Sequence, residues 1–114
     1  MKKLILTAVL SSLATATFCF YLPPGENLLD NKRVTVTRVT YQPGKPRERY
    51  IRPTDQVIVF LDDSEYERID SATKEKTIRK RKSGDVIWHD QGEDAPILTN
   101  QLAKPFRTLV IELK

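Results

Sequence analysis

Few residues in this sequence could carry out chemistry without help from distant parts of the chain. The only histidine, His89, is flanked by Trp88 and Asp90. An imidazole titrates near neutral pH and could act as a general base, but a base needs a positioned partner, and the alternative is a residue at the rim of a turn. The acids Asp90, Glu93 and Asp94 could bind a hard cation weakly, but their spacing is not that of an EF-hand loop. No nucleophile motif, phosphate-binding loop or nucleotide fingerprint occurs, so no local motif predicts catalysis.

The densest charged segment is the basic run from Arg79 to Lys82. Such a run could bind nucleic acid through its phosphates. On a strand, however, alternation sends Arg79 and Arg81 to one face and Lys80 and Lys82 to the other. Proteins that bind single strands interleave aromatic side chains, and this run has none. We therefore expect a solvated edge strand protected by charge, and no nucleic-acid partner.

The beginning of the chain has the features of a secretory signal peptide. A basic start, Met1 to Lys3, precedes an apolar stretch from Leu4 to Leu13 and the small-residue site Ala14-Thr15-Ala16. The alternative is an uncleaved anchor, but the apolar stretch is short for a membrane span. Cleavage would remove residues 1–16 with Lys2 and Lys3, and would lower the net charge from +4 to +2. We expect a periplasmic or secreted protein that is not membrane-bound after signal cleavage.

The rest of the 114 residues, with 39% hydrophobic and 30% charged composition overall, suits one small domain. Residues 17–30 are expected to form an N-terminal lead-in, irregular from Phe18 to Gly25, and residues 31–114 the domain. Strand patterns separated by turn residues recur every eight to twelve residues, which indicates an all-β sandwich or barrel. Within Arg33 to Tyr41, Val34 and Val36 share one face whereas Val39 and Tyr41 share the other, and this switch predicts a bulge or a strand crossing near Thr37. Further strands are expected at Val57 to Leu61, Tyr66 to Ile69, Lys74 to Lys82, Val86 to Trp88, Ile97 to Thr99 and Phe106 to Leu113.

The spacing of turn residues over 31–114 resembles that of small single-domain cupins of the RmlC-like, secreted bacterial type. Their first motif is similar to glycine, five residues, histidine, one residue, histidine, three or four residues, glutamate. Counted from Gly44, the two histidine positions hold Tyr50 and Arg52, and the glutamate position holds Gln56. The resemblance implies a cupin-like small β-barrel, that is, a double-stranded β-helix or jelly roll. It also implies a homodimer, because such domains often pair.

The second cupin motif is matched in its glycines but not in its metal ligand. Gly84 and Gly92 have the separation that the family shows, whereas Ala95 stands at the histidine position. The resemblance therefore implies the fold while the metal ligands are missing. We expect no metal site, no cofactor and no metal-dependent activity.

The three substituted positions of the first motif suggest an anion site instead. If Tyr50, Arg52 and Gln56 point into the barrel, Arg52 could grip a carboxylate or phosphate, and its neighbours could add neutral hydrogen bonds. The alternative is that Arg52 pairs internally, with Asp55 or Glu48, and fills the pocket.

Three functions compete at this point. The first is a secreted or periplasmic, metal-free domain that binds a small anionic ligand and has no assigned catalytic residue. The second is a metal-independent isomerase or epimerase that uses Tyr50 as acid and His89 as base. The third is a structural or protein-binding dimer module. An open pocket with an unpaired Arg52 favours the first, Tyr50 and His89 in one cavity favour the second, and a filled pocket favours the third.

Overall fold

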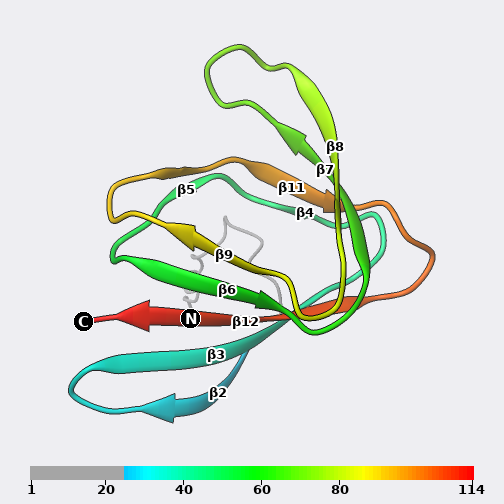
Figure 1. Cartoon of the computed structure of the whole chain (residues 1–114). Helices are drawn as coiled ribbons and strands as arrows, with labels where there is room; N and C mark the ends of the chain where they lie inside the picture. The colour runs from blue at the N-terminus through cyan, green and yellow to red at the C-terminus, as the bar shows by residue number, and fades with distance from the viewer. Residues whose placement is uncertain (1–24) are drawn as a thin grey trace, which may run out of the picture.

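In the computed structural model, residues 25–114 are described, and all of their regular elements are β-strands (Figure 1). The all-β prediction is therefore confirmed. The predicted signal peptide and residues 17–24 lie outside the described residues. Within residues 25–114 no helix is long and apolar enough to cross a membrane. The strands are β2 (Gly25–Asp30), β3 (Val34–Tyr41), β4 (Pro46–Arg47), β5 (Tyr50–Ile51), β6 (Gln56–Phe60), β7 (Ser64–Ile69), β8 (Lys76–Arg81), β9 (Val86–His89), β10 (Asp94–Ala95), β11 (Ile97–Asn100) and β12 (Phe106–Leu113).

Two large sheets face each other and a small one joins them at one end (Figure 1). The five-stranded sheet has the order β2-β3-β12-β6-β9, and the four-stranded sheet has the order β4-β11-β7-β8. Strands β5 and β10 form a third, two-stranded pair. All of these strand pairings are antiparallel. Apart from the hairpins β2–β3 and β7–β8, neighbours in a sheet are far apart in the sequence, as in a jelly roll.

The core between the sheets is aromatic. Tyr41, Ile58, Phe60, Tyr66 and Phe106 form one buried cluster. The Tyr41 and Phe106 rings stack with centroids 5.0 Å apart, and the Phe60 and Tyr66 rings stack at 6.1 Å. These residues alternate with outward-facing neighbours on β3, β6, β7 and β12, as side chains do on pleated strands. They also form part of the wall of the cavity described below.

Strand β3 corrects one expectation from the sequence. It pairs with β12 without interruption from Val34 to Tyr41, so the predicted bulge does not lie in β3 itself. The bulge lies in the partner strand β2, between Asn27 and Leu29, opposite Thr37 and Val36. The change of face between Val36 and Val39 needs no irregularity in β3. Side chains alternate regularly along the strand, and its apolar residues face outward in the first half and inward in the second. The sheet also begins before residue 31, since β2 pairs with β3 along the five-stranded sheet.

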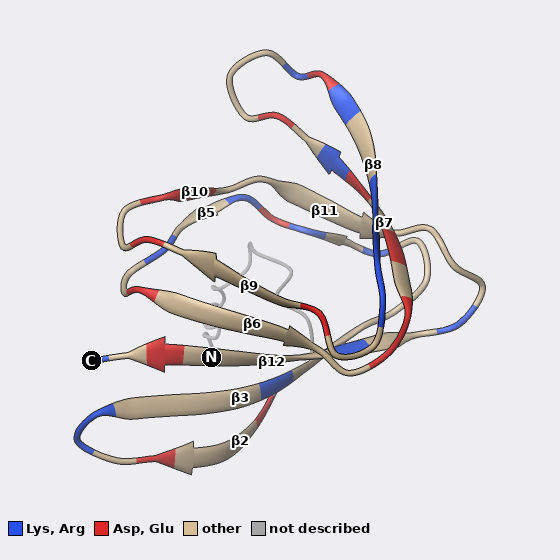
Figure 2. Cartoon of the chain, in the orientation of Figure 1, with Lys and Arg blue, Asp and Glu red and all other residues tan. Residues whose placement is uncertain are grey.

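The outward side of the five-stranded sheet is apolar. We call it the outer apolar face; it consists of Leu29, Val34, Val36, Val57, Val59, Val86, Trp88, Leu109, Ile111 and Leu113, which the strand register places on one side. Arg38 and Arg107 lie on the same side at one end. Charged residues are sparse along β6 and β12, whereas β7 and β8 carry many (Figure 2). Antiparallel sheets with one solvated face usually alternate apolar and polar residues, so this face has the composition of a covered surface.

Two of the glycines that matched the cupin motif have a backbone that requires glycine. Gly84 has a φ of 93° in the turn before β9, and Gly92 has a φ of 85° in the turn before β10. Side chains other than hydrogen are strained in this left-handed region. Gly84 therefore shapes the turn that leads into β9, and Gly92 shapes the turn that leads into Glu93 and Asp94.

Candidate functional site

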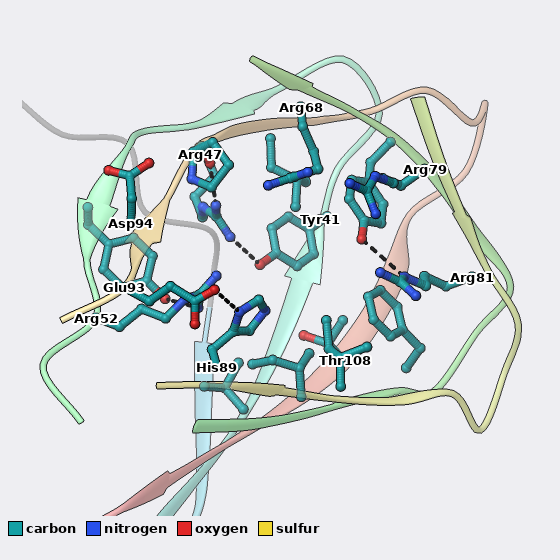
Figure 3. Close-up of a pocket in the computed structure, with 18 of the residues that line it drawn as sticks. Tyr41, Arg47, Arg52, Arg68, Arg79, Arg81, His89, Glu93, Asp94 and Thr108 are labelled. Carbon is teal, nitrogen blue, oxygen red and sulfur yellow. Dashed lines mark hydrogen bonds and ion pairs between the residues drawn. The ribbon is translucent and has the colours of Figure 1, made fainter. Parts of the chain in front are cut away.

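A cavity of about 190 Å³ lies between the two large sheets (Figure 3). The aromatic core forms part of its wall, and polar side chains from the four-stranded sheet and the β5–β10 end form the rest. A pocket of this size suits a small molecule or the end of a larger one.

Five arginines line this cavity: Arg47 on β4, Arg52 directly after β5, Arg68 on β7, and Arg79 and Arg81 on β8. None of them forms an ion pair with a carboxylate within residues 25–114. Sequence reasoning identified only Arg52. It placed Arg79 and Arg81 on one face and expected a solvated edge strand. Both are confirmed, since β8 is an edge strand whose residues are mostly exposed, but the sequence did not predict that this face also lines the cavity.

The register of the four-stranded sheet explains why these arginines meet. Arg47 and Arg68 both lie opposite Leu98, from the two strands that flank β11. Arg79 lies opposite Tyr66 on the neighbouring pair of strands. Residues opposite one another, or two apart on one strand, share a face. The four-stranded sheet therefore presents one basic inner face.

Arg52 is held in place without an acid. Its side chain is buried, with 6% of the residue exposed, and its Nη1 donates to the Tyr50 hydroxyl at 3.2 Å and to Gln56 Oε1 at 2.7 Å. Its backbone N–H donates to the Glu93 carbonyl, and its carbonyl accepts from the Gly92 N–H. Burial, followed by the nearby charge of Arg47, lowers the pKa of Arg52, yet a guanidinium stays protonated.

The proposed internal partners of Arg52 are not its partners. No carboxylate of Asp55 or Glu48 lies within 4.0 Å of it, and Asp55 instead accepts the backbone N–H of Gln91. Gln56 is 1% exposed and does not line the cavity. It lies behind Arg52, and its Nε2 donates to Glu112. Of the expected ligand-binding residues, Tyr50 and Arg52 line the cavity and Gln56 supports Arg52.

Arg47 is the second buried arginine, with 7% of the residue exposed. It donates to the Tyr41 hydroxyl at 3.3 Å and to the Pro96 carbonyl. The guanidinium carbons of Arg47 and Arg52 lie 5.3 Å and 5.6 Å from the centroid of the Tyr50 ring. The ring face attracts both cations. The Nε atoms of both arginines are buried and have no hydrogen-bond partner within the described residues.

The two acids of the cavity wall already have basic or hydroxyl partners. Asp94 accepts hydrogen bonds from Ser71 Oγ and Arg49 Nε, and these partners lower its pKa. Glu93 lies 3.4 Å from His89 Nδ1, and a backbone hydrogen bond to Asp90 is the first cause that lowers its pKa. With His89 neutral, five arginines and two carboxylates leave a wall charge of +5 − 2 = +3. The acids therefore do not neutralise the arginines.

His89 and Tyr50 line the same cavity. Burial, and then the charge of Arg52, lowers the pKa of His89, and Glu93 acts in the opposite direction. The neutral imidazole is therefore favoured at pH 7, as a general base requires. The Tyr50 hydroxyl accepts a hydrogen bond from Arg52.

The donor set at the cupin metal positions does not fit a divalent metal. Register places Ala95 opposite Tyr50, so the corresponding positions of the two motifs do meet across β5 and β10. There, however, the side chains are a methyl group, a phenol and the guanidinium of Arg52, which is itself a cation. No group of three or more histidine, cysteine, aspartate or glutamate side chains is arranged to hold a metal within residues 25–114. Transition-metal sites need three or four such ligands.

Comparison with known proteins was informative only at the level of structure. No protein-family model matches the sequence, and no curated protein matches it. A cupin domain from Bordetella pertussis superposes with a TM-score of 0.72 at 20% identity, over 81% of this chain and 93% of that one. A double-stranded β-helix domain protein from Klebsiella pneumoniae gives 0.62 at 17% identity, over 80% and 76%. The polyketide cyclase RemF from Streptomyces resistomycificus gives 0.64 at 16% identity, over 78% and 63%. The chain therefore has the cupin fold.

Proposed function

We propose that this cupin-fold protein binds a small anionic ligand in the cavity between its sheets, without metal-dependent catalysis. One observation carries the proposal: five arginines line one cavity and none is ion-paired within the described residues. Buried charges are found where they are paired, because an unpaired buried charge is strongly destabilising. An anion from solution would supply the missing partner.

The chemistry of the donors also favours an anion. Arginine presents planar N–H groups that match the oxygen atoms of a carboxylate or phosphate. Arg52 and Arg47 are fixed by hydrogen bonds to neutral groups, so they are organised before a ligand arrives. A preorganised site loses less conformational entropy on binding.

Replacement of Arg52 tests the proposal. Arg52→Met keeps most of the apolar stem and removes a buried charge that has no acidic partner, so the free energy of unfolding without ligand should hold or rise. Sulfate, phosphate and small carboxylates should raise the melting temperature of the wild type, and this shift should vanish in Arg52→Met. Arg52→Lys, which keeps the charge but loses the planar fork, should retain part of it.

The matched control is Arg33→Met, which removes an exposed arginine outside the cavity. It should leave the anion-dependent shift unchanged. A wild type that shows no shift with any of these anions, together with a strongly destabilised Arg52→Met, would mean that Arg52 has a structural role and that the proposal is wrong.

A metal-independent isomerase or epimerase is the second candidate. It is supported by the presence of Tyr50 and His89 on one cavity wall, with a neutral imidazole favoured. In this role Tyr50 would act as the acid and His89 as the base. RemF is an enzyme of the same fold, which is compatible with catalysis on this scaffold.

Two further parts of the proposal concern assembly and location. The outer apolar face supports pairing of two copies of the chain, which is also the surface that a structural or protein-binding module would use. The sequence of residues 1–16 supports export to the periplasm or medium after signal cleavage.

A further inference from the structure

We infer that the ligand is a short dicarboxylate that lies across the cavity, with one carboxylate at each of two arginine groups. This inference rests on the proposed function. The first arginine group is Arg47 and Arg52, and the second is Arg79 and Arg81. Figure 3 shows these groups on opposite sides of the cavity, with Tyr41, Arg68 and Thr108 between them.

The sheet keeps the two groups apart. Arg47 lies on β4 and the second group lies on β8, which are the two edge strands of the four-stranded sheet. Three strand spacings separate their backbones, roughly 14 Å at about 4.8 Å each. Hydrogen bonds tether both groups, since Arg47 and Arg52 bond to Tyr41 and Tyr50, and Arg81 Nε bonds to the Tyr66 hydroxyl at 3.4 Å. A single compact anion therefore satisfies one group and leaves the other without a partner.

Each group has donors to spare. A guanidinium carries five N–H donors. Arg47 and Arg52 each make two side-chain hydrogen bonds, which leaves three N–H donors on each. The side chains of Arg79 and Arg68 make no hydrogen bond or ion pair within the described residues. With a wall charge of +3, one negative charge is too few and two are better matched.

The space between the groups suits a short carbon chain. Its wall is formed by aromatic rings, including Tyr41, Phe60 and Phe106. Thr108 adds one polar atom there: the residue is 2% exposed, and its Oγ1 is buried without a hydrogen-bond partner. A buried hydroxyl normally has a partner. A hydroxyl or keto oxygen on the ligand's chain would supply one for Thr108.

The test removes one charge at a time from the ligand and from the protein. Titration calorimetry would compare succinate with its monomethyl ester, which lacks one carboxylate, on the wild type, Arg52→Met, Arg79→Met and Arg81→Met. Removal of one charge-assisted contact typically weakens binding roughly tenfold to a hundredfold. The wild type should therefore bind succinate at least about tenfold more tightly than the ester. Each substitution should weaken succinate by a similar factor and reduce the difference between the two ligands.

Arg33→Met is again the control, and a melting curve of each variant verifies folding. Arg79→Met is the safest variant of the second group, because Arg79 is exposed at the cavity rim and has no tether to lose. Malate, which adds a hydroxyl to succinate, should gain affinity in the wild type and lose that gain in Thr108→Val.

The outcomes separate this inference from the proposed function. If the monoester binds as tightly as succinate, or if Arg79→Met and Arg81→Met both leave succinate binding unchanged, the ligand does not span the cavity and the inference is wrong. Anion binding that depends on Arg52 would then still stand. If neither sulfate, phosphate nor any carboxylate binds the wild type, both the inference and the proposed function are wrong.

Discussion

His89 reports on the electrostatics of the cavity, because its charge is coupled to that of Arg52. Burial and the positive charge of Arg52 both lower its pKa from the ordinary 6.5, and Glu93 only partly offsets them. The unfolded chain titrates near the ordinary value, so between the two pKa values it binds more protons than the folded chain does. The free energy of unfolding therefore rises with pH in that window, and the contribution is lost as the pH falls below about 6.5.

We predict that His89 titrates below pH 6.5 and that Arg52→Met raises its pKa toward 6.5. Saturating sulfate should also raise it, because a bound anion offsets the positive charge that disfavours the imidazolium. By linkage, sulfate should then bind more tightly at lower pH. Since the sequence has one histidine, its ring signal in an NMR titration is unambiguous. A His89 pKa at or above 6.5 in the wild type would contradict this account. So would a His89 pKa that changes neither in Arg52→Met nor on addition of sulfate.

At the scale of elements, the five-stranded sheet is apolar on its outer face as well as on the inner face that forms the core. Strands β6 and β12 are apolar on both sides, as strands are when both faces are covered. The face is about five strands wide and five to eight residues long, roughly 500 Å² per copy and about 1,000 Å² for two copies, which is near the lower limit of specific interfaces. Charge on this side is confined to one end, where Arg38 pairs with Glu26 and Arg107 with Asp62, so a second copy that apposes its apolar part is the most compatible partner.

We predict that the chain is a dimer in solution and that Val86→Glu dissociates it. Val86 is 61% exposed in the single chain, so a carboxylate there has little effect on folding but would be desolvated in a paired face. Light scattering coupled to size-exclusion chromatography should show the dimer weakened by more than about tenfold. Ile78→Glu is the matched control, because Ile78 is similarly exposed at 50% but lies on β8, outside the outer apolar face. A monomeric wild type at its highest soluble concentration would rule out this pairing.

At the scale of the whole molecule, export would determine which chain folds and with what charge. Cleavage between Ala16 and Thr17 leaves 114 − 16 = 98 residues and a net charge of +2. The cavity charge of +3 is unaffected, because all five of its arginines lie beyond residue 46. The proposed anion site would therefore be retained after cleavage.

We predict that the protein recovered from the periplasm or medium begins at Thr17. Intact-mass measurement would identify the mature terminus, and Ala16→Arg should block the cleavage because signal cleavage sites need small residues. Soluble, exported protein that still carries residue 1 would be inconsistent with the expected signal peptide.

The sequence by itself determined the fold class and the position of one part of the site. Turn residues at regular intervals predicted an all-β domain, and the spacing from Gly44, Gly84 and Gly92 predicted the cupin topology. These signals are local, because a glycine with positive φ is required by its own turn. The same spacing singled out Tyr50 and Arg52, which line the cavity in the structure. Ala95 lies opposite Tyr50, so the corresponding positions of the two motifs meet.

Only the tertiary structure decided which way the charged strand faces and which charges meet. Alternation put Arg79 and Arg81 on one side of β8, but a pattern with charges on both sides does not say which side faces the cavity. Register across β11 then brought Arg47 and Arg68 to the same inner face, from positions 21 residues apart in the sequence. Whether Arg52 would find a carboxylate also depended on contacts between distant segments. The basic cavity is thus a product of strand pairing, which no short stretch of the sequence encodes.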